Sequence, residues 1–373
     1  MKLYPFEMER WQSTWENKVE YNLSESGVHP LQLNAILDND TAELLSQSLG
    51  YSQSNGTEEL RRTISTLYPG ADVDDVLVTN GSSEANFVVL WSFLDRDAEV
   101  AIMLPNYMQA WGVAKTLKAK ALPVWLKEKE GRWVFDIRKL RKSVSRRTKL
   151  IAVCNPNNPT GSVLDESEID QICEIAKKVG AWVLSDEVYH GAELAGSETP
   201  TFWGRYEKSI VTNGLSKAYG LPGLRLGWIA AKDTANKLWS YRDYTTIAPG
   251  AISDYLARRV LQTETRNRLL ARTRKILQSN LPILTRWVER HRSYLSFIPP
   301  KAGAIVYLKY SLNVNSTELA ERLLKEKKTL LVPGDHFHMD RYIRLGYGGA
   351  QDQLEAGLAR VGEVLVNLQA SGN

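Results

Sequence analysis

The feature of this sequence that most constrains its fold is an alternation of strand-like and helix-like segments across residues 51–233. Short apolar runs such as "DVLVTN", "EVAIMLP" and "KLIAVCN" are separated by amphipathic segments. Strands that alternate with helices of about 10–15 residues indicate βαβ units and a parallel sheet. Because the apolar runs are continuous, both faces of this sheet are expected to be buried. The sequence therefore predicts an α/β fold, in which ligands bind at the carboxyl ends of the strands.

The rest of the chain has a different pattern. A long stretch at residues 253–291 carries apolar residues at helical spacing and no strand signal. Short strand-like runs such as "GAIVYLKY" and "YIRLGYG" follow, and then a closing helix-like segment. A chain of this length is expected to divide in two. We predict a large domain at residues 46–275 and a smaller α+β domain at residues 276–373. The N-terminal segment, residues 1–45, is expected to pack with the smaller domain.

The composition excludes several classes of protein. The net charge is +4 over 373 residues and no long Lys/Arg run concentrates it, so we expect no nucleic-acid partner. No segment approaches 18 consecutive apolar residues, and the N-terminus lacks the apolar region of a signal peptide. Two cysteines do not form a disulfide framework, and the five histidines lack metal-ligand spacing. We therefore expect a cytoplasmic protein with no bound metal.

Small, aromatic and amide residues follow the first strand-like runs. Asn80-Gly81-Ser82-Ser83 opens a helix-like segment. Such a helix N-terminus can bind a phosphate through free backbone N–H groups, although the same residues can serve only as an N-cap. Tyr107 can stack on a flat ligand or pack in the core. The segment "NPNNPTG" at residues 155–161 has a backbone restricted by two prolines, so it is either a rigid turn or a device that aims an amide side chain.

Charged residues follow two further runs. Asp186 comes at the end of "AWVLS", where a carboxylate in a buried layer needs a partner such as a protonated ring nitrogen. Lys217 and Arg225 lie in "GLSKAYGLPGLRLGW" among small and apolar residues. A desolvated lysine has a lowered pKa and is suited to forming a Schiff base, although a structural ion pair is the alternative. Together these residue types match the needs of pyridoxal 5′-phosphate (PLP), which combines a phosphate, a flat pyridine ring and an aldehyde.

The segments "NPNNPTG", "SDEVYH" and "LSKAYGLPGLRLGW", in this order and spacing, resemble the class I/II aminotransferases, which are PLP-dependent enzymes of the type I fold. The segments "YSQSNG", "ELR", "LVPGDHFH" and "YIRLGYG" are similar to other parts of the same family. The resemblance implies a mostly parallel seven-stranded sheet sandwiched by helices, plus a smaller α+β domain formed by the two termini. It also implies a homodimer with shared active sites.

The resemblance implies a role for each matching position. Lys217 would form the Schiff base with the cofactor and shuttle a proton, Asp186 would keep the pyridine nitrogen protonated, and Tyr189 would bond the phenolic oxygen. The cofactor-binding residues implied are Gly81, Ser82, Ser83, Tyr107, Asn158, Asp186, Tyr189, Ser216, Lys217, Arg225 and, reaching the phosphate of a neighbouring subunit, Tyr51. The substrate-binding residues implied are Arg344, which would clamp the α-carboxylate, Gly27 and Asn158.

One position departs from the family pattern. The family often has Ser or Thr three residues before the lysine as a phosphate ligand, whereas this chain has Gly214. One phosphate hydrogen bond is therefore expected to be missing or mediated by water.

Three functional hypotheses follow. The first is an aminotransferase that moves an amino group between an α-amino acid and a 2-oxo acid in amino-acid metabolism. The second is a PLP-dependent lyase, cyclase or oxidase, because "SGVHP" and "LSKAYGLPGLRLGW…RDYTT" are also similar to capreomycidine synthase, which cyclises an arginine derivative. Trp11, His29, Tyr244 and Thr245 are candidates for deciding between these reactions. The third, a regulatory protein that kept the fold, lacks a spare segment for a DNA-binding module.

Overall fold

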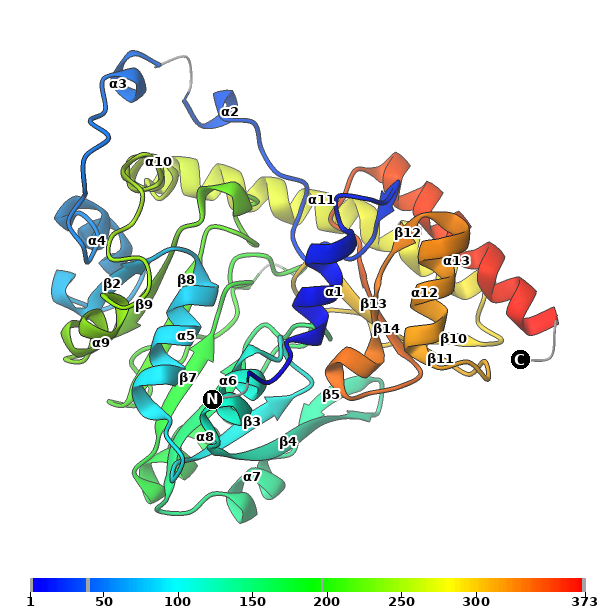
Figure 1. Cartoon of the computed structure of the whole chain (residues 1–373), viewed down its shortest axis with the longest axis horizontal. Coiled ribbons are helices and arrows are strands. Elements are labelled where there is room, and N and C mark those ends of the chain that lie inside the picture. The colour runs from blue at the N-terminus through cyan, green and yellow to red at the C-terminus, as the bar shows by residue number, and fades with distance from the viewer. Residues whose placement is uncertain (1–2, 38–40, 196, 371–373) are drawn as a thin grey trace.

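A large mixed sheet forms the centre of the computed structural model, which describes residues 3–37, 41–195 and 197–370 (Figure 1). Its strands, in order across the sheet, are β2 (Val76–Thr79), β9 (Gly227–Ala231), β8 (Ser209–Gly214), β7 (Trp182–Asp186), β6 (Thr148–Cys154), β3 (Glu99–Leu104), β4 (Lys120–Lys129) and β5 (Arg132–Phe135). Strands β4, β3, β6, β7 and β8 are parallel, whereas β9 is antiparallel to both of its neighbours. The predicted α/β class with a mostly parallel sheet is confirmed.

The sheet has eight strands, one more than the seven expected. The additional strand is β5, which forms an antiparallel hairpin with β4 and pairs Lys129 with Arg132. The two residues between them, Glu130 and Gly131, both have positive φ, 51° and 71°. Two such residues are what a type I′ hairpin turn requires, but Glu is not a residue usually found there. The turn therefore carries no clear sequence signal, and the hairpin was not predicted.

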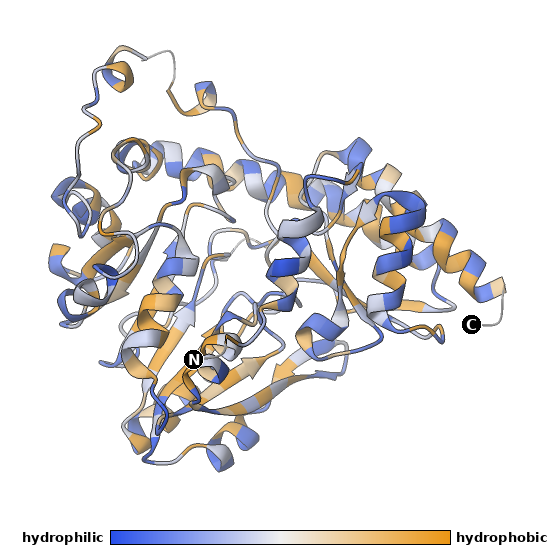
Figure 2. Ribbon diagram, in the orientation of Figure 1, coloured by the Kyte–Doolittle hydropathy of each residue, from blue (hydrophilic) through white to orange (hydrophobic). Residues whose placement is uncertain are grey.

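Helices flank this sheet. Their bounds are α4 (Glu58–Ser65), α5 (Ser82–Phe93), α6 (Gln109–Leu117), α7 (Ile137–Ser143), α8 (Glu166–Val179) and α9 (Ala235–Arg242). Every residue of β2, β3, β8 and β9 is buried, and the strands carry the strongest hydrophobic colouring of the molecule (Figure 2). The burial of both faces expected from the continuous apolar runs is confirmed.

A smaller antiparallel sheet is built from the C-terminal part of the chain. Its strands, in order, are β10 (Leu295–Phe297), β11 (Ile305–Tyr310), β14 (Tyr342–Gly346) and β13 (Val332–Pro333). Two helices, α12 (Ser316–Lys327) and α13 (Gln351–Ala370), lie beside it (Figure 1). The N-terminal segment joins these elements, because α1 (Glu7–Trp15) contacts β13 and because β1 (Tyr21–Asn22) pairs in parallel with β12 (Thr329–Leu330).

The long helical stretch forms two helices, α10 (Ala251–Val260) and α11 (Thr263–Arg290). Gln262 between them has an extended backbone, with φ −58° and ψ 137°, and this interrupts the helix. Helix α11 runs continuously across residues 275 and 276, so the boundary expected there falls inside a helix. The domain limits stay a prediction. Within the described residues, no helix is long and apolar enough to cross a membrane.

Candidate active site

The predicted binding edge of the large sheet contains a cavity of about 380 Å³. This volume is within the range of small-molecule sites, about 300–1,000 Å³. The residues predicted from sequence that line the cavity are Ser82, Ser83, Tyr107, Asn158, Asp186, Tyr189, Ser216, Lys217 and Arg225. They come from segments that follow β2, β3, β6, β7 and β8. The topology thus brings together residues that are up to 143 positions apart in the sequence, from Ser82 to Arg225.

The loop "NPNNPTG" uses two of its asparagines to hold its own shape. Asn157 accepts a hydrogen bond from the Thr160 hydroxyl at 2.7 Å and donates to the Pro105 carbonyl at 3.1 Å. Asn155 accepts one from the Leu164 backbone N–H at 2.9 Å. These bonds aim the third asparagine, Asn158, into the cavity. The loop is therefore both a rigid turn and a device that positions an amide.

Asp186 lies at the end of β7 with its carboxylate inside the molecule. It accepts hydrogen bonds from Asn86 Nδ2 at 2.7 Å and from the Val188 backbone N–H at 3.1 Å. Asn86 is itself fixed, since its Oδ1 accepts a hydrogen bond from the Thr212 hydroxyl at 2.7 Å. Burial raises the pKa of Asp186, and the two hydrogen bonds act in the opposite direction. No lysine or arginine of the described residues pairs with it, so a cationic group in the cavity would stabilise its charged form.

Two tyrosines line the same cavity. Tyr189 is 2% exposed, and its buried hydroxyl has no hydrogen-bond partner among the described residues, although it lies near Ser26. Tyr107 donates a hydrogen bond from its hydroxyl to Glu9 Oε2 at 3.0 Å, which fixes the ring between the sheet and α1. An unpaired buried hydroxyl is costly, so Tyr189 points to a ligand atom that accepts or donates a hydrogen bond there.

The N-terminus of α5 forms one wall of the cavity. Gly81 precedes the helix with φ 88°, a conformation that favours glycine, and a Cβ at this residue would lie 2.5 Å from Arg225 Nη2. The guanidinium therefore sits against the start of α5. Backbone N–H groups in the first turn of a helix have no intrahelical partner. This wall combines them with the hydroxyls of Ser82 and Ser83 and with the positive charge of Arg225, a donor set suited to a phosphate.

Gly214, where the family often has a hydroxyl, lies in a close contact between strands and helix. A Cβ at Gly214 would be 2.9 Å from the Leu226 carbonyl oxygen, 3.1 Å from Gly227 Cα and 3.4 Å from Ser82 N. Those neighbours are backbone atoms, which cannot swing aside. The glycine thus lets β8 and β9 approach the start of α5, and a hydroxyl-bearing side chain does not fit.

Lys217 forms an ion pair, the alternative that the sequence left open, and its partner is Glu25. Its Nζ lies 2.9 Å from Glu25 Oε1, which also accepts hydrogen bonds from the backbone N–H groups of Ser26 and Gly27. The Lys217 ammonium lowers the pKa of Glu25 to about 2. The expected lowering of the lysine pKa is wrong for this state. Burial does act to lower the pKa of Lys217, but Glu25 and Tyr189 outweigh it and the net shift is upward.

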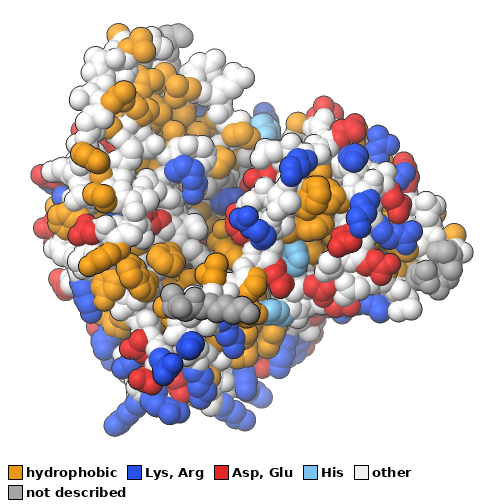
Figure 3. All heavy atoms as spheres, viewed as in Figure 1, with side chains coloured by type: hydrophobic (Ala, Val, Ile, Leu, Met, Phe, Trp, Pro, Cys, Tyr) orange, Lys and Arg blue, Asp and Glu red, His pale blue; other side chains and the backbone are white. Residues whose placement is uncertain are grey.

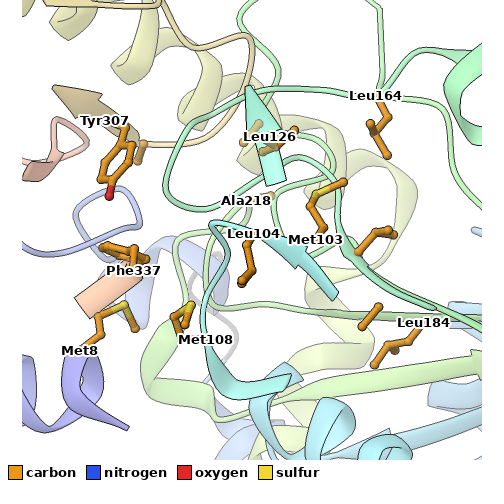
Figure 4. Close-up of a cluster of buried hydrophobic side chains, with 14 of the residues drawn as sticks. Met8, Met103, Leu104, Met108, Leu126, Leu164, Leu184, Ala218, Tyr307 and Phe337 are labelled. Carbon is orange, nitrogen blue, oxygen red and sulfur yellow. The ribbon is translucent and has the colours of Figure 1, made fainter. Parts of the chain in front are cut away.

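Arg344 lies behind the cavity rather than in its wall. The side chain is fully buried. Its Nη2 donates to Gln12 Oε1 at 3.0 Å and to the Ser24 carbonyl at 2.6 Å, and its Nη1 donates to Asn158 Oδ1 at 3.2 Å. Met8 of α1 also covers it, with Sδ 3.4 Å from Nη1. Figure 4 shows Met8 within the buried hydrophobic cluster that includes Phe337, whose ring lies 5.7 Å from the guanidinium.

Comparison with known proteins decides the family. The family model described as aminotransferase class I and II matches residues 21–361, nearly the whole chain. This chain belongs to the class I and II aminotransferase family. It is a PLP-dependent aminotransferase, as the sequence resemblance implied.

The relatives of this aminotransferase match most of its length. A solved PLP-dependent aminotransferase from Streptococcus suis is 34% identical, covers 99% of both chains and superposes with a TM-score of 0.92. Aromatic-amino-acid aminotransferase 2 of Thermococcus litoralis is 26% identical over 84% of each chain. Capreomycidine synthase of Streptomyces vinaceus is 27% identical over 96% of this chain and 93% of the relative. The similarity to capreomycidine synthase noted from the sequence is thus confirmed, and most of these relatives are aminotransferases.

The cavity of this aminotransferase fits PLP. It offers a phosphate donor set at α5. It also offers two buried groups that lack a partner within the described part of the chain, the Asp186 carboxylate, which has no cation beside it, and the Tyr189 hydroxyl, which has no hydrogen bond. The amine of Lys217 opens into the same space. Each of these groups matches a different part of the cofactor. A bound PLP would supply the partners that Asp186 and Tyr189 lack among the described residues.

Several sequence candidates lie outside the cavity. Gly27 is close to it, since a Cβ there would be 3.5 Å from Lys217 Cδ. Tyr51 is 92% exposed and contributes nothing to the cavity of its own chain. Trp11, His29, Tyr244 and Thr245 do not line it either. Trp11 instead donates to the Leu331 carbonyl, and Thr245 contacts Glu84.

Five polar residues of the cavity wall were not predicted from the sequence. They are Glu9, Gln12, Glu16, Glu25 and Ser26. The first three share one face of α1 and its C-terminal end, at spacings of three and four residues. That spacing is visible in "EMERWQSTWE", but the pattern alone does not say which surface the helix covers. Within the described residues, no group of three His, Cys, Asp or Glu side chains could hold a metal ion.

Proposed function

We propose that this aminotransferase moves an amino group between an α-amino acid and a 2-oxo acid in the cavity around Lys217. The observation that carries the proposal is that Lys217, which follows β8, and Asp186, at the end of the adjacent strand β7, share one cavity. An amine and a buried carboxylate at neighbouring strand ends are the two groups that PLP chemistry demands of a protein. When bound, PLP supplies an aldehyde for amines and a protonated ring that withdraws electrons from the substrate Cα.

We assign the ring-binding roles to Asp186, Tyr189, Asn158 and Tyr107. Asp186 would hold the proton on the pyridine nitrogen, and Asn86 keeps its carboxylate oriented toward the cavity. Tyr189 would bond the phenolic oxygen through its hydroxyl, which has no hydrogen-bond partner in the described residues. Asn158 accepts from Arg344 with Oδ1, which leaves its amide N–H groups for the same oxygen. Tyr107 would cover one face of the ring.

We assign phosphate binding to the wall at the start of α5. Gly81, Ser82 and Ser83 would donate hydrogen bonds, and Arg225 would supply positive charge. Ser216, whose hydroxyl lies 3.4 Å from Arg225 Nη1, would complete the set. Since Gly214 leaves no space for a side chain, the hydroxyls of Ser82, Ser83 and Ser216 would take the place of the one that it lacks.

Lys217 would carry the cofactor and move the proton at the substrate Cα. Its Nζ pairs with Glu25, so the amine is held charged until that pairing is broken or the proton is passed on. A general base must be neutral to accept a proton. Glu25 would therefore control when Lys217 becomes reactive.

Arg344 would bind the α-carboxylate, a geometry that suits its planar guanidinium. Gln12 and Met8 of α1 now contact the guanidinium, and Gly27 lies beside Lys217 in the adjacent segment. A substrate carboxylate would displace Gln12 from Arg344. We therefore propose that α1 shifts when substrate binds.

We further propose that the enzyme is a cytoplasmic homodimer in which Tyr51 of one subunit reaches the phosphate bound by the other. The exposure of Tyr51 supports this, because a tyrosine that is 92% exposed in one chain gains partners if a second chain covers it.

The alternative is a PLP-dependent lyase, cyclase or oxidase, which the similarity to capreomycidine synthase over 96% of the chain favours. One assay separates the two. The PLP-loaded enzyme is mixed with single amino acids and no oxo acid. Transamination predicts conversion of the cofactor to its amine form, one equivalent per site, with release of the matching oxo acid. Catalytic release of ammonia or peroxide, or a cyclised product, would establish the alternative.

A further inference from the structure

The wall of the cavity formed by α1 and the segment after it carries three carboxylates. Glu9 and Glu16 lie on α1 and its C-terminal end, and Glu25 follows β1. No described lysine or arginine lies within ion-pair distance of Glu9 or Glu16. Glu9 accepts a hydrogen bond from Tyr107, whereas Glu16 has no side-chain hydrogen bond within the described residues. Glu16 is therefore a half-buried carboxylate that faces the cavity without a partner.

The three carboxylates are close enough to act on one another. Partial burial raises the pKa of Glu16, and the charges of Glu25 and Glu9 raise it further, while the Lys217 ammonium acts in the opposite direction. Among the described residues, the cation that forms an ion pair with this wall is Lys217, through Glu25. The hydroxyl of Tyr189, which is 2% exposed and has no hydrogen-bond partner among the described residues, faces the same cavity, so the three carboxylates line the space in which the cofactor is proposed to bind.

The charges around the cavity indicate the charge of the substrate side chain. This step rests on the proposed function. With PLP and substrate bound, Arg225 faces the phosphate, Asp186 faces the pyridine nitrogen and Arg344 faces the α-carboxylate. Lys217 is then occupied by the cofactor or by proton transfer, so Glu25 also loses its cation. The wall of three carboxylates then keeps negative charge, because Arg344, whose charge also acts on Glu9 and Glu25, is engaged by the α-carboxylate of the substrate.

We propose that the preferred substrate is an α-amino acid whose side chain ends in a cation, an ammonium or a guanidinium, held by Glu9, Glu16 and Glu25. A cationic side chain would form charge-assisted hydrogen bonds with these carboxylates. A dicarboxylic amino acid would place its second carboxylate against them and be repelled. A neutral side chain would leave them unpaired.

The test compares amino acids of matched shape. The PLP-loaded enzyme is mixed with lysine against norleucine, arginine against citrulline, and glutamate, and the second-order rate constant for conversion of the cofactor to its amine form is measured. We expect each cationic amino acid to exceed its neutral counterpart by about tenfold or more, and glutamate to be the slowest. Equal rates within a pair, or glutamate as the best substrate, would overturn the proposal.

Substitutions of Glu16 test whether the carboxylate wall causes the preference for cationic side chains. Glu16→Gln should reduce the ratio of lysine to norleucine by about threefold to tenfold, and Glu16→Lys should raise the rate with glutamate. Glu7→Gln is the matched control, because Glu7 is an exposed acid on the same helix outside the cavity, and its ratio should equal that of the wild type. Equal losses in Glu16→Gln and Glu7→Gln would contradict recognition by the wall.

The wild-type panel separates this proposal from the proposed function. Stoichiometric transamination of neutral or acidic amino acids without preference for the cationic ones would contradict only the proposed cationic substrate and leave the proposed transamination intact. A cofactor-loaded enzyme that converts none of the amino acids to oxo acids would contradict transamination itself and the substrate class with it.

Discussion

At the scale of single residues, the ion pair between Lys217 and Glu25 has the largest functional consequence. Lys217 must lose a proton to react with an aldehyde, yet the Glu25 carboxylate 2.9 Å away stabilises the charged amine. Burial alone would favour the neutral amine, so the two effects oppose each other and Glu25, with Tyr189, prevails. The Lys217 ammonium and the Glu25 carboxylate therefore stabilise each other in their charged forms.

Glu25→Gln should make Lys217 reactive at lower pH. Removing the negative charge leaves burial as the main influence, so the pKa of Lys217 falls and the neutral amine is present over a wider pH range. The rate at which the apoenzyme takes up PLP, followed by absorbance across a pH series, should rise at a lower pH in Glu25→Gln than in the wild type. An unchanged or upward shift of that midpoint would show that Glu25 does not hold the proton on Lys217.

At the scale of elements, the close approach of β8, β9 and α5 explains the departure at Gly214. A side chain there would meet the Leu226 carbonyl at 2.9 Å and Gly227 Cα at 3.1 Å. Restoring the hydroxyl of the family pattern by Gly214→Ser should therefore destabilise the protein by about 1–3 kcal/mol, the usual cost of overpacking. Urea denaturation would measure the loss.

Gly223→Ser is the matched control for that prediction. Nothing lies within 4 Å of a Cβ at Gly223, and its φ is not positive, so the same chemical change should leave the free energy of unfolding nearly unchanged. If Gly214→Ser were as stable as Gly223→Ser and bound PLP more tightly than the wild type, the steric explanation would fail.

The strands and helices around the cavity differ in how far the sequence predicts their contribution to the site. Asp186 and Lys217 were predictable because parallel strands place their carboxyl ends at one edge, so residues after different strands meet there. The contribution of α1 was not, since an amphipathic helix carries no mark of its partner. Glu25 pairs with a lysine 192 positions away, and only the fold brings them together. Arg344 was predicted to bind the substrate α-carboxylate. Its hydrogen bond to Gln12 was not predictable, because that contact depends on how α1 packs.

At the scale of the whole molecule, exposed apolar side chains gather where the segment bearing Tyr51 meets the loop before α10. Ser52 Oγ donates to the Pro249 carbonyl at 2.9 Å, which joins the two segments. Figure 3 shows hydrophobic side chains collected over the region of α2 (Asn34–Leu37) and α3 (Ala42–Leu45). The most exposed large apolar residues of α3 and the segment after it are Leu45 at 83%, Leu49 at 82% and Tyr51 at 92%. Such a surface is expected to be covered by a second subunit.

Sedimentation should accordingly give about twice the mass of one chain at micromolar concentration. Leu45→Asp combined with Leu49→Asp should shift the protein toward monomer, because two charges would be buried in the interface. Val366→Asp changes a residue that is 49% exposed on α13, away from this surface, and should leave the dimer intact. A wild-type monomer, or equal dissociation in both variants, would contradict the proposed dimer.

The central claim is that Lys217 carries the cofactor, and covalent trapping tests it most directly. The enzyme is incubated with PLP, reduced with borohydride, digested and mapped by mass spectrometry, with Lys217→Ala treated in parallel. The pyridoxyl group is predicted on the peptide that contains Lys217, in a yield of about one per chain, because Lys217 is the one lysine among the described residues that line the cavity. No peptide of the variant should carry it in comparable yield. A label on another lysine, or equal labelling of Lys217→Ala, would contradict the account.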